Sequence, residues 1–214
     1  MKKDRKVTRG PIRDKEKTMK KLVRAVGSIL EKKGYAGLNG NSIAKEAKVD
    51  RRLIYSHFGS VDKLVEVYIQ HKDFWTPETN TQLQDILSNP KPRGQEDILL
   101  LLNNQFNAIL SNKELQRILL WELSESNPIL RKISDGRELL GESLFQFVEP
   151  DFKDSNLDLR AILALMISGV YYSALHAVNN GSTFCGIDIN QPEGKLRIEG
   201  AIQQLLNMCY GKLN

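Results

Sequence analysis

Cysteines and long apolar runs are scarce in this 214-residue sequence. The two cysteines, Cys185 and Cys209, cannot by themselves form a disulfide framework or a four-ligand zinc site. No stretch approaches the roughly 20 apolar residues that span a bilayer, and no apolar run of signal-peptide length follows the basic N-terminus. We therefore expect a cytoplasmic protein with reduced thiols and no membrane partner.

Motifs for catalysis and metal binding are also missing. The three histidines, His57, His71 and His176, have no metal-site spacing such as His-Glu-x-x-His. The sequence holds neither a phosphate-binding loop nor the nucleophile elbow of the α/β-hydrolases. We therefore expect no enzyme, no cofactor and no metal.

Charge is present, but it is divided unevenly along the chain. Residues 1–72 hold 19 lysines and arginines against 8 acidic residues, a balance of +11, whereas residues 73–214 hold 12 against 18, a balance of −6. A basic head on an acidic body indicates that the head meets a polyanion. Nucleic acid is one such partner and an anionic membrane surface is another; a merely solvated lysine-rich surface is the third reading.

Apolar residues recur at helical spacing through most of the chain, and no stretch alternates as a strand does. Residues 14–33 carry one apolar stripe that ends at Gly34, a C-terminal cap residue. Residues 40–47 and 51–58 form two short helices, and Ser60 caps a fourth. Further helices are expected over residues 95–110, 113–124, 128–148, 157–179 and 193–209. These patterns predict an all-α protein.

The chain is expected to have three parts. Residues 1–13 are basic and contain Gly10-Pro11, which is typical of a flexible arm. Residues 14–75 hold the short helices, and residues 76–214 form a larger helical domain. Asn39 and Asp50 are good N-caps for the two short helices, and only three residues separate these helices. This spacing predicts a helix-turn-helix.

A helix-turn-helix reads DNA through the first residues of its second helix, which enter the major groove. Arg51 and Arg52 stand there, and an arginine can pair bidentately with guanine. Other side chains nearby carry amide, hydroxyl or imidazole groups that can bind phosphate oxygens. The candidate phosphate contacts are Asn39, Asn41, Ser42, Tyr55 and His57.

The stretch from Asp14 to about Tyr68 resembles the DNA-binding domain of TetR-type transcriptional regulators. The resemblance covers about a quarter of the chain and depends on several residues at fixed spacing. These residues are Glu31-Lys32-Lys33-Gly34-Tyr35, Asn39, Ile43, Ala44, Ala47, Val49, Leu53, Ile54, Tyr55, His57, Phe58, Ser60 and Leu64.

The resemblance implies an all-α homodimer that binds a DNA operator through its first three helices and pairs through its last two. It also implies a small-molecule pocket in the larger domain, whose occupation shifts the fourth helix. Val61 stands where the family usually has a lysine, and Lys63 is a substitute phosphate contact. Gly40 and Asn41 are weak helix formers and open the second helix unusually. We therefore expect the arm, Lys2 to Arg13, to add DNA contacts.

Aromatic side chains in the larger domain are candidates for lining a pocket. Such residues belong to the core more often than to a pocket, and Glu122 could face a cationic ligand or solvent. The candidates are Trp75, Phe106, Trp121, Tyr171, Tyr172 and His176.

Together these features predict a sequence-specific transcriptional regulator, a repressor that responds to an unknown small molecule and binds a pseudo-palindromic operator as a homodimer. Two alternatives stay open. One is a helical small-molecule-binding protein or enzyme whose basic head is not used on DNA. The other is a membrane-surface protein that uses the basic arm.

Overall fold

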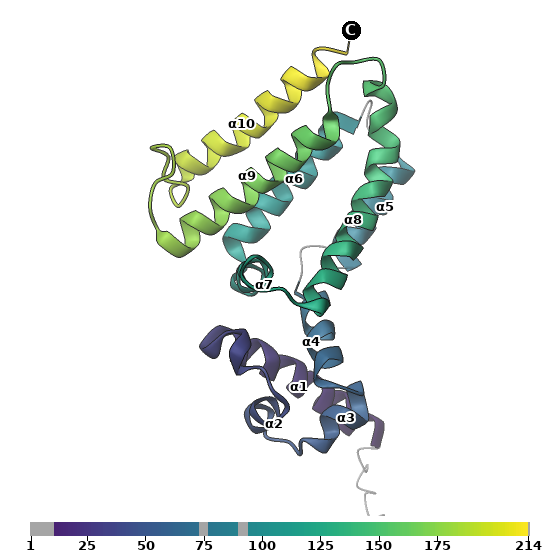
Figure 1. Ribbon diagram of the computed structural model, residues 1–214, viewed down its shortest axis with the longest axis vertical. Coiled ribbons are helices and arrows are strands. Elements are labelled where there is room, and N and C mark those ends of the chain that lie inside the picture. The colour runs from purple at the N-terminus through teal and green to yellow at the C-terminus, as the bar shows by residue number, and fades with distance from the viewer. Residues whose placement is uncertain (1–10, 73–76, 90–93, 214) are drawn as a thin grey trace, which may run out of the picture. The chain divides into compact units, whose positions relative to one another are not determined.

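The structure of the chain is a computed structural model that describes residues 11–72, 77–89 and 94–213. Within these ranges the regular secondary structure consists of helices, apart from one isolated β-bridge between Phe184 and Ile187. The chain divides into two compact units, residues 1–72 and 73–214. Figure 1 draws the first in purple and blue and the second in teal to yellow. The all-α fold expected from the sequence is confirmed.

The first unit is a small helical bundle. Each of its four α-helices contributes fully buried side chains to the core, including Leu22, Ile43, Ile54 and Leu64, all with 0% exposure. The long first helix contacts the other three, so the two short helices rest on a common support. The elements are α1 (Pro11–Lys33), η1 (Tyr35–Gly37), α2 (Gly40–Ala47), α3 (Arg52–Phe58) and α4 (Val61–Gln70).

Helix α1 begins earlier than the sequence pattern predicts. We expected a flexible arm through Arg13, with Gly10-Pro11 as a breaker, but α1 starts at Pro11. Proline suits the first turn of a helix, because its fixed φ is already helical and its missing N–H would have no partner there. Pro11 therefore opens the helix, and the rest of the expected arm, residues 1–10, lies outside the described residues.

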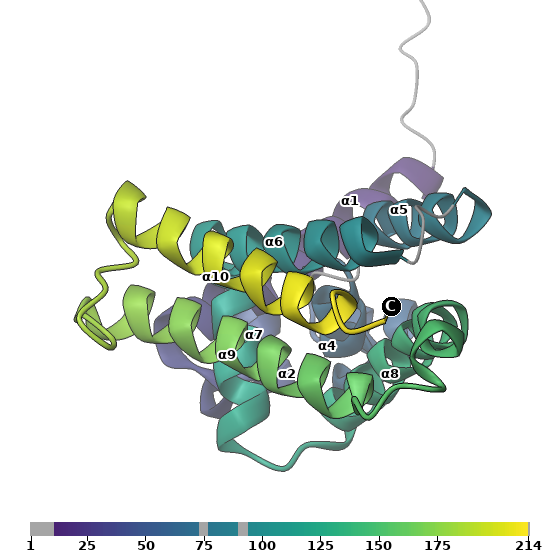
Figure 2. The same cartoon turned by 90° about the horizontal axis from the view of Figure 1, so that it is seen from above.

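The second unit holds longer helices. In Figure 2, α9 and α10 run in opposite directions and are joined by the loop of residues 181–191. Helix α6 contacts both of them. The elements are α5 (Pro77–Ser88), α6 (Gln95–Ser111), α7 (Lys113–Ser124), α8 (Pro128–Val148), η3 (Glu149–Phe152), α9 (Leu159–Asn180) and α10 (Pro192–Tyr210).

Helix α5 was not predicted from the sequence. Its residues are mostly polar, so the few apolar positions did not form a conspicuous stripe. Leu83 and Ile86 are nevertheless buried, and they form a small core with Leu101 of α6. Tertiary packing of two side chains one turn apart therefore stabilises a helix that has little periodicity of its own.

Helix α9 departs from the expectation that no segment is long and apolar enough to cross a membrane. By length and composition alone, residues 159–180 meet that description. One face of the helix, however, lies in the main core of the second unit, where Leu163, Val170 and Ala174 are buried beside residues of α6 and α10. A core helix satisfies the same length and composition criteria, so the finding is weak evidence for a membrane span.

The start of α6 is tightly fitted against the end of α8. Gly94 caps α6 with a left-handed φ of 66°. A Cβ atom built at this glycine would lie 2.5 Å from Val148 Cγ1 and 3.1 Å from Phe147 Cε1. Both the backbone conformation and the lack of space require glycine here.

Candidate nucleic-acid interface

Helices α2 and α3 form the helix-turn-helix that the sequence predicts. Asn39 caps α2, since its Oδ1 accepts a hydrogen bond from the Ser42 N–H at 2.9 Å. Lys48 then turns the chain with a left-handed φ of 55°. The Asp50 carboxylate accepts the Arg52 N–H at 2.7 Å, so Asp50 caps the next helix as expected, although α3 begins at Arg52 and not at Arg51.

The inner faces of both short helices are apolar. Ile43, Ala44 and Ala47 of α2 and Ile54 and Phe58 of α3 are buried. Side-chain bonds also tie α2 to α1, because Glu46 accepts hydrogen bonds from Ser28 Oγ at 2.6 Å and from Lys32 Nζ at 3.1 Å. These bonds lower the pKa of the Glu46 carboxyl, chiefly through Ser28. The buried apolar contacts and the bonds between α1 and α2 thus hold α3 in place, with its outer face toward solvent.

Arg51 is held by side chains of both helices. Its Nη1 donates to Asn41 Oδ1 at 3.2 Å and its Nη2 donates to Tyr55 Oη at 2.9 Å. The guanidinium carbon also lies 5.6 Å from the centre of the Tyr55 ring, within the range of a cation–π contact. We call Gly40, Asn41, Arg51 and Tyr55 the Arg51 cluster.

Arg52 differs from its neighbour. Its side chain is exposed, and within the described part of the chain no hydrogen bond or ion pair holds its guanidinium. The Tyr55 ring is 44% exposed beside it on the same helix. The outer face of α3 therefore presents one restrained arginine and one unrestrained arginine.

The other predicted DNA contacts differ in exposure and in hydrogen bonding. Asn39 and Ser42 are both used in the α2 cap. Lys63 is exposed in the first turn of α4, where its backbone N–H donates to Ser60 Oγ at 3.1 Å. His57 is half-buried, and its Nδ1 is enclosed without a hydrogen-bond partner among the described residues. The structure thus brings Asn41, Arg51 and Tyr55 together and leaves Arg52, His57 and Lys63 outside that hydrogen-bonded group.

The second unit contains a pocket of about 450 Å³. Residues of α6, α7, α8 and α9 line it, with polar and apolar side chains side by side. They are Gln105, Glu122, Ser134, Arg137, Glu138, Gly141, Phe145, Arg160, Ala164, Ile167, Ser168 and Tyr171.

Three of the four charged residues that line this pocket, Glu122, Arg137 and Arg160, are held in ion pairs. Arg137 Nη1 lies 2.7 Å from Glu122 Oε2, and the Ser134 hydroxyl donates to Glu122 Oε1 at 2.6 Å. The sequence suggested that Glu122 could contact a cationic ligand. In the structure its carboxylate is already paired with the Arg137 guanidinium. Gln105 Nε2 donates to Tyr171 Oη at 2.7 Å across the pocket.

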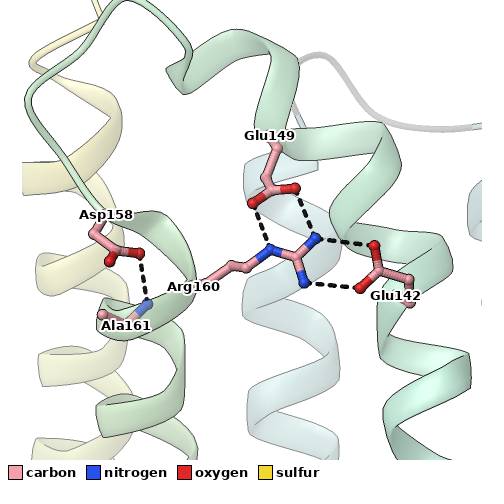
Figure 3. Close-up of polar contacts among 5 residues, drawn as sticks. All are labelled: Glu142, Glu149, Asp158, Arg160 and Ala161. Atoms are coloured by element: carbon pink, nitrogen blue, oxygen red, sulfur yellow. Dashed lines mark hydrogen bonds and ion pairs between the residues drawn. The ribbon is translucent and has the colours of Figure 1, made fainter.

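Arg160, which lines the pocket, bridges the carboxylates of Glu142 and Glu149, as Figure 3 shows. Its guanidinium bonds to Glu142 at 2.7 and 3.0 Å and to Glu149, and it lies 4.4 Å from the centre of the Phe145 ring. The hydrogen bonds from Arg160 lower the pKa of both carboxyls and raise the pKa of the guanidinium. Arg160 thus joins α9 to the end of α8.

Of the predicted ligand-binding residues that the structure describes, only Tyr171 lines this pocket. Phe106 and Trp121 are buried, at 0% and 5% exposure, and Phe106 lies in the main core. Tyr172 stacks on His176 at 5.7 Å, and both lie near Phe184, away from the pocket residues. Trp75 lies outside the described residues.

Sequence reasoning missed several pocket residues because it searched for aromatics. Arg137, Phe145 and Arg160 gave no pattern of their own, since each needs a partner from another helix. Gln105 did leave a signal: it is a polar residue on the buried face of α6, one turn from Leu101 and Leu102. A buried polar side chain needs a hydrogen-bond partner, so such a position marks a polar interior.

A second hollow lies along the outer surface of α9 and α10. It measures about 350 Å³ and its wall is almost entirely apolar. Leu165 is 75% exposed and Leu205 is 47% exposed. The lining residues are Ile162, Leu165, Met166, Gly169, Val170, Ser173, Ile198, Ala201, Ile202 and Leu205. Among the described residues, no group of three His, Cys, Asp or Glu side chains is placed to bind a metal.

Comparisons with known proteins agree with this architecture. The model of the bacterial regulatory proteins of the tetR family matches residues 18–68. No curated protein sequence matches the chain. Three solved structures share its fold, at TM-scores of 0.63, 0.63 and 0.61.

The first is the transcriptional regulator FadR from Bacillus subtilis in complex with stearoyl-CoA, which is 16% identical; the match covers 87% of this chain and 96% of that one. The second is native NalD, the secondary repressor of the MexAB-OprM multidrug efflux pump in Pseudomonas aeruginosa, at 19% identity with 89% and 96% covered. The third is a TetR family transcription regulator from Marinobacter aquaeolei VT8, at 16% identity with 92% and 97% covered. The chain is therefore similar to the bacterial regulatory proteins of the tetR family over residues 18–68, which hold its helix-turn-helix, and it shares the fold of these three structures over 87–92% of its length.

Proposed function

We propose that the protein is a ligand-responsive transcriptional repressor that binds a pseudo-palindromic operator as a homodimer. The observation that carries the proposal is the outer face of α3, where exposed Arg52 and Tyr55 stand on a helix whose other face is buried. A recognition helix needs this combination, because base edges can be read only by side chains whose backbone is held in place. The balance of +11 over residues 1–72 supports it, since DNA attracts basic surfaces.

The apolar hollow on α9 and α10 supports a dimer. A second copy of the chain would cover exposed Leu165 and Leu205, and monomeric proteins rarely leave such a patch open. An interface of this kind is two-fold symmetric, so each copy presents the same surface to the other. The operator should then consist of two half-sites about 34–36 Å apart, one turn of B-DNA.

The mixed pocket of the second unit supports an effector. Its volume of about 450 Å³ is in the range of small-molecule sites. Glu122 is paired with Arg137, and Arg160 with Glu142 and Glu149, so both arginines of the wall are already neutralised, whereas Glu138 lines the pocket without an ion-pair partner among the described residues. We therefore propose an effector that carries no negative charge, with polar groups toward Gln105 and Ser134 and an apolar part against Phe145 and Ile167.

One experiment tests the proposal directly. Random duplex DNA is selected on the purified protein at two salt concentrations, and the bound sequences are read. We expect a two-fold symmetric site whose affinity falls as salt rises. A flat sequence profile would indicate binding by charge alone and would refute sequence-specific regulation.

The alternatives give other results. A helical small-molecule-binding protein or enzyme would show no salt-dependent DNA binding at all. A membrane-surface protein would bind anionic vesicles and would lose that binding when residues 1–13 are deleted, whereas the proposed regulator would retain most of its operator binding without them.

A further inference from the structure

The adjacent arginines Arg51 and Arg52, at the start of the recognition helix, have different surroundings, which indicates different roles in DNA binding. We infer that Arg51 is a positioning residue, which fixes Tyr55 and Asn41 against the DNA backbone, and that Arg52 is the arginine that reads a base. The inference rests on the proposed DNA-binding function.

The first step concerns the hydrogen bonds of Arg51. An arginine reads guanine by directing two N–H groups at O6 and N7. Both terminal nitrogens of Arg51 already donate, one to Asn41 at 3.2 Å and one to Tyr55 at 2.9 Å. Each terminal nitrogen keeps one further N–H, but the two bonds and the contact with the Tyr55 ring hold the guanidinium in one orientation, so Arg51 cannot turn toward a base without losing them. Arg51 is therefore suited to hold its neighbours and less suited to read a base than an arginine that is free to turn.

The second step concerns Gly40, whose place at the start of α2 looked unfavourable from the sequence. Gly40 is buried, and a Cβ atom there would lie 3.0 Å from Arg51 Nε, 3.4 Å from Val61 Cγ2 and 3.6 Å from Tyr55 Oη. The glycine weakens the helix relative to alanine, but it leaves room for the Arg51 side chain over the first turn of α2. The unfavourable glycine at the start of α2 is thus explained by the space that the Arg51 side chain occupies.

The third step concerns what the Arg51 cluster presents to a duplex. Tyr55 Oη accepts a hydrogen bond from Arg51, so its own proton is directed elsewhere and can be donated to a phosphate oxygen. Gly40 and Asn41 open α2, where backbone N–H groups and the helix dipole favour an anion. Holding these donors in place beforehand reduces the entropy lost on binding.

The fourth step concerns Arg52. The Asp50 carboxylate fixes its backbone N–H at 2.7 Å, while its exposed side chain has no hydrogen-bond or ion-pair partner in the described parts of the chain. A base-reading residue needs this combination of a fixed backbone and an available guanidinium.

The test compares Arg51→Gln and Arg52→Gln in the full chain by selection from random duplex DNA at two salt concentrations. We expect Arg52→Gln to lose about 5- to 150-fold in discrimination at one base pair of each half-site. Arg51→Gln should keep every base preference and bind all duplexes more weakly by about the same factor, roughly tenfold. Loss of a base preference in Arg51→Gln, or unchanged preferences in Arg52→Gln, would overturn the inference.

Gly40→Ala provides a second test that leaves every donor in the sequence. The added methyl group would lie 3.0 Å from Arg51 Nε, so the Arg51 side chain must shift by a few tenths of an ångström. The affinity for all duplexes should fall, by less than in Arg51→Gln, while the Tm stays the same or rises because alanine favours the helix. The matched control is Gly136→Ala in α8, where an added Cβ meets nothing within 4 Å; its DNA affinity should equal that of the wild type. Wild-type affinity in Gly40→Ala would contradict the inference.

The double variant Gly40→Ala/Arg51→Gln completes the test. If both changes remove the same arrangement, the double variant should bind DNA no more weakly than Arg51→Gln alone, whereas additive losses would show that the two residues act separately. Failure of the two claims can be distinguished: a wild-type protein that selects no site refutes the proposed function itself, and a wild-type protein that selects a site while the variants depart from these results refutes only the roles of Arg51 and Arg52.

Discussion

Arginines in the two units of this protein are used in opposite ways. In the helix-turn-helix, Arg51 is bound only by neutral side chains and Arg52 by none in the described residues, so the positive charge stays available to an outside partner. In the second unit, Arg137 and Arg160 are each held by carboxylates. Their charge is neutralised inside the chain.

The difference shows how one chain can prepare two kinds of contact. Uncompensated charge on the first unit suits a polyanion that releases its counterions on binding. Neutralised arginines and an exposed apolar strip on the second unit suit partners that exclude water, such as another copy or a small molecule without negative charge. Each prediction below alters one side of this contrast.

The largest effect is expected at the apolar hollow of α9 and α10. Leu165→Asp should weaken the proposed dimer by about 100-fold or more, because an unpaired carboxylate would be buried between the two copies. Light scattering over a concentration series measures the change. Leu123→Asp is the matched control, since Leu123 of α7 is 74% exposed and lies outside the hollow, and it should leave the mass unchanged. Equal masses for wild type and Leu165→Asp would place the interface elsewhere.

Next in size is the ion pair of the pocket. Glu122→Gln removes the carboxylate that faces Arg137, and it should lower the free energy of unfolding by about 1–3 kcal/mol, less than for a fully buried pair because Glu122 is 25% exposed. Denaturant unfolding gives the value. Replacing both residues, Glu122→Gln with Arg137→Gln, should recover part of the loss. A double variant as unstable as the sum of the single ones would argue against a paired charge.

A smaller effect is expected from single lysines. Lys63→Gln should weaken binding to every duplex alike and reduce the slope of log affinity against log salt by about 0.9 if Lys63 meets one phosphate. Lys113→Gln in the second unit, also an exposed lysine, serves as the comparison and should leave the slope unchanged. Identical slopes for the two variants would exclude Lys63 as a phosphate contact.

The smallest effect concerns pH. Because Arg160 lowers the pKa of Glu142 and Glu149 in the folded state, its bonds stabilise the fold above the ordinary range of carboxyl groups, and the stabilisation is lost as pH falls through the lowered values. The Tm difference between wild type and Arg160→Gln should therefore be present at pH 7 and shrink toward pH 3. Arg131→Gln, which breaks only an exposed pair with Asp135, should show little difference at either pH. A gap that does not change with pH would contradict this role of the two carboxyls.

Local signals predicted the helix-turn-helix well. Asn39 and Ser60 are N-caps whose side chains accept hydrogen bonds three residues along, and such bonds depend only on neighbouring sequence. The second unit was predicted less completely. Helix α5 forms because two side chains meet α6, and the pocket forms because α6, α7, α8 and α9 converge. Contacts between distant segments leave no fixed spacing, so aromatic residues such as Phe106 were a poor guide to them.

The fit at Gly94 limits how the pocket of the second unit can change its width. Gly94 and Val148 leave no room between the start of α6 and the end of α8, and the same two helices supply Gln105 and Phe145 to the pocket wall. A side chain larger than glycine at residue 94 should therefore push the start of α6 away from the end of α8 and change the spacing of the two helices that supply Gln105 and Phe145.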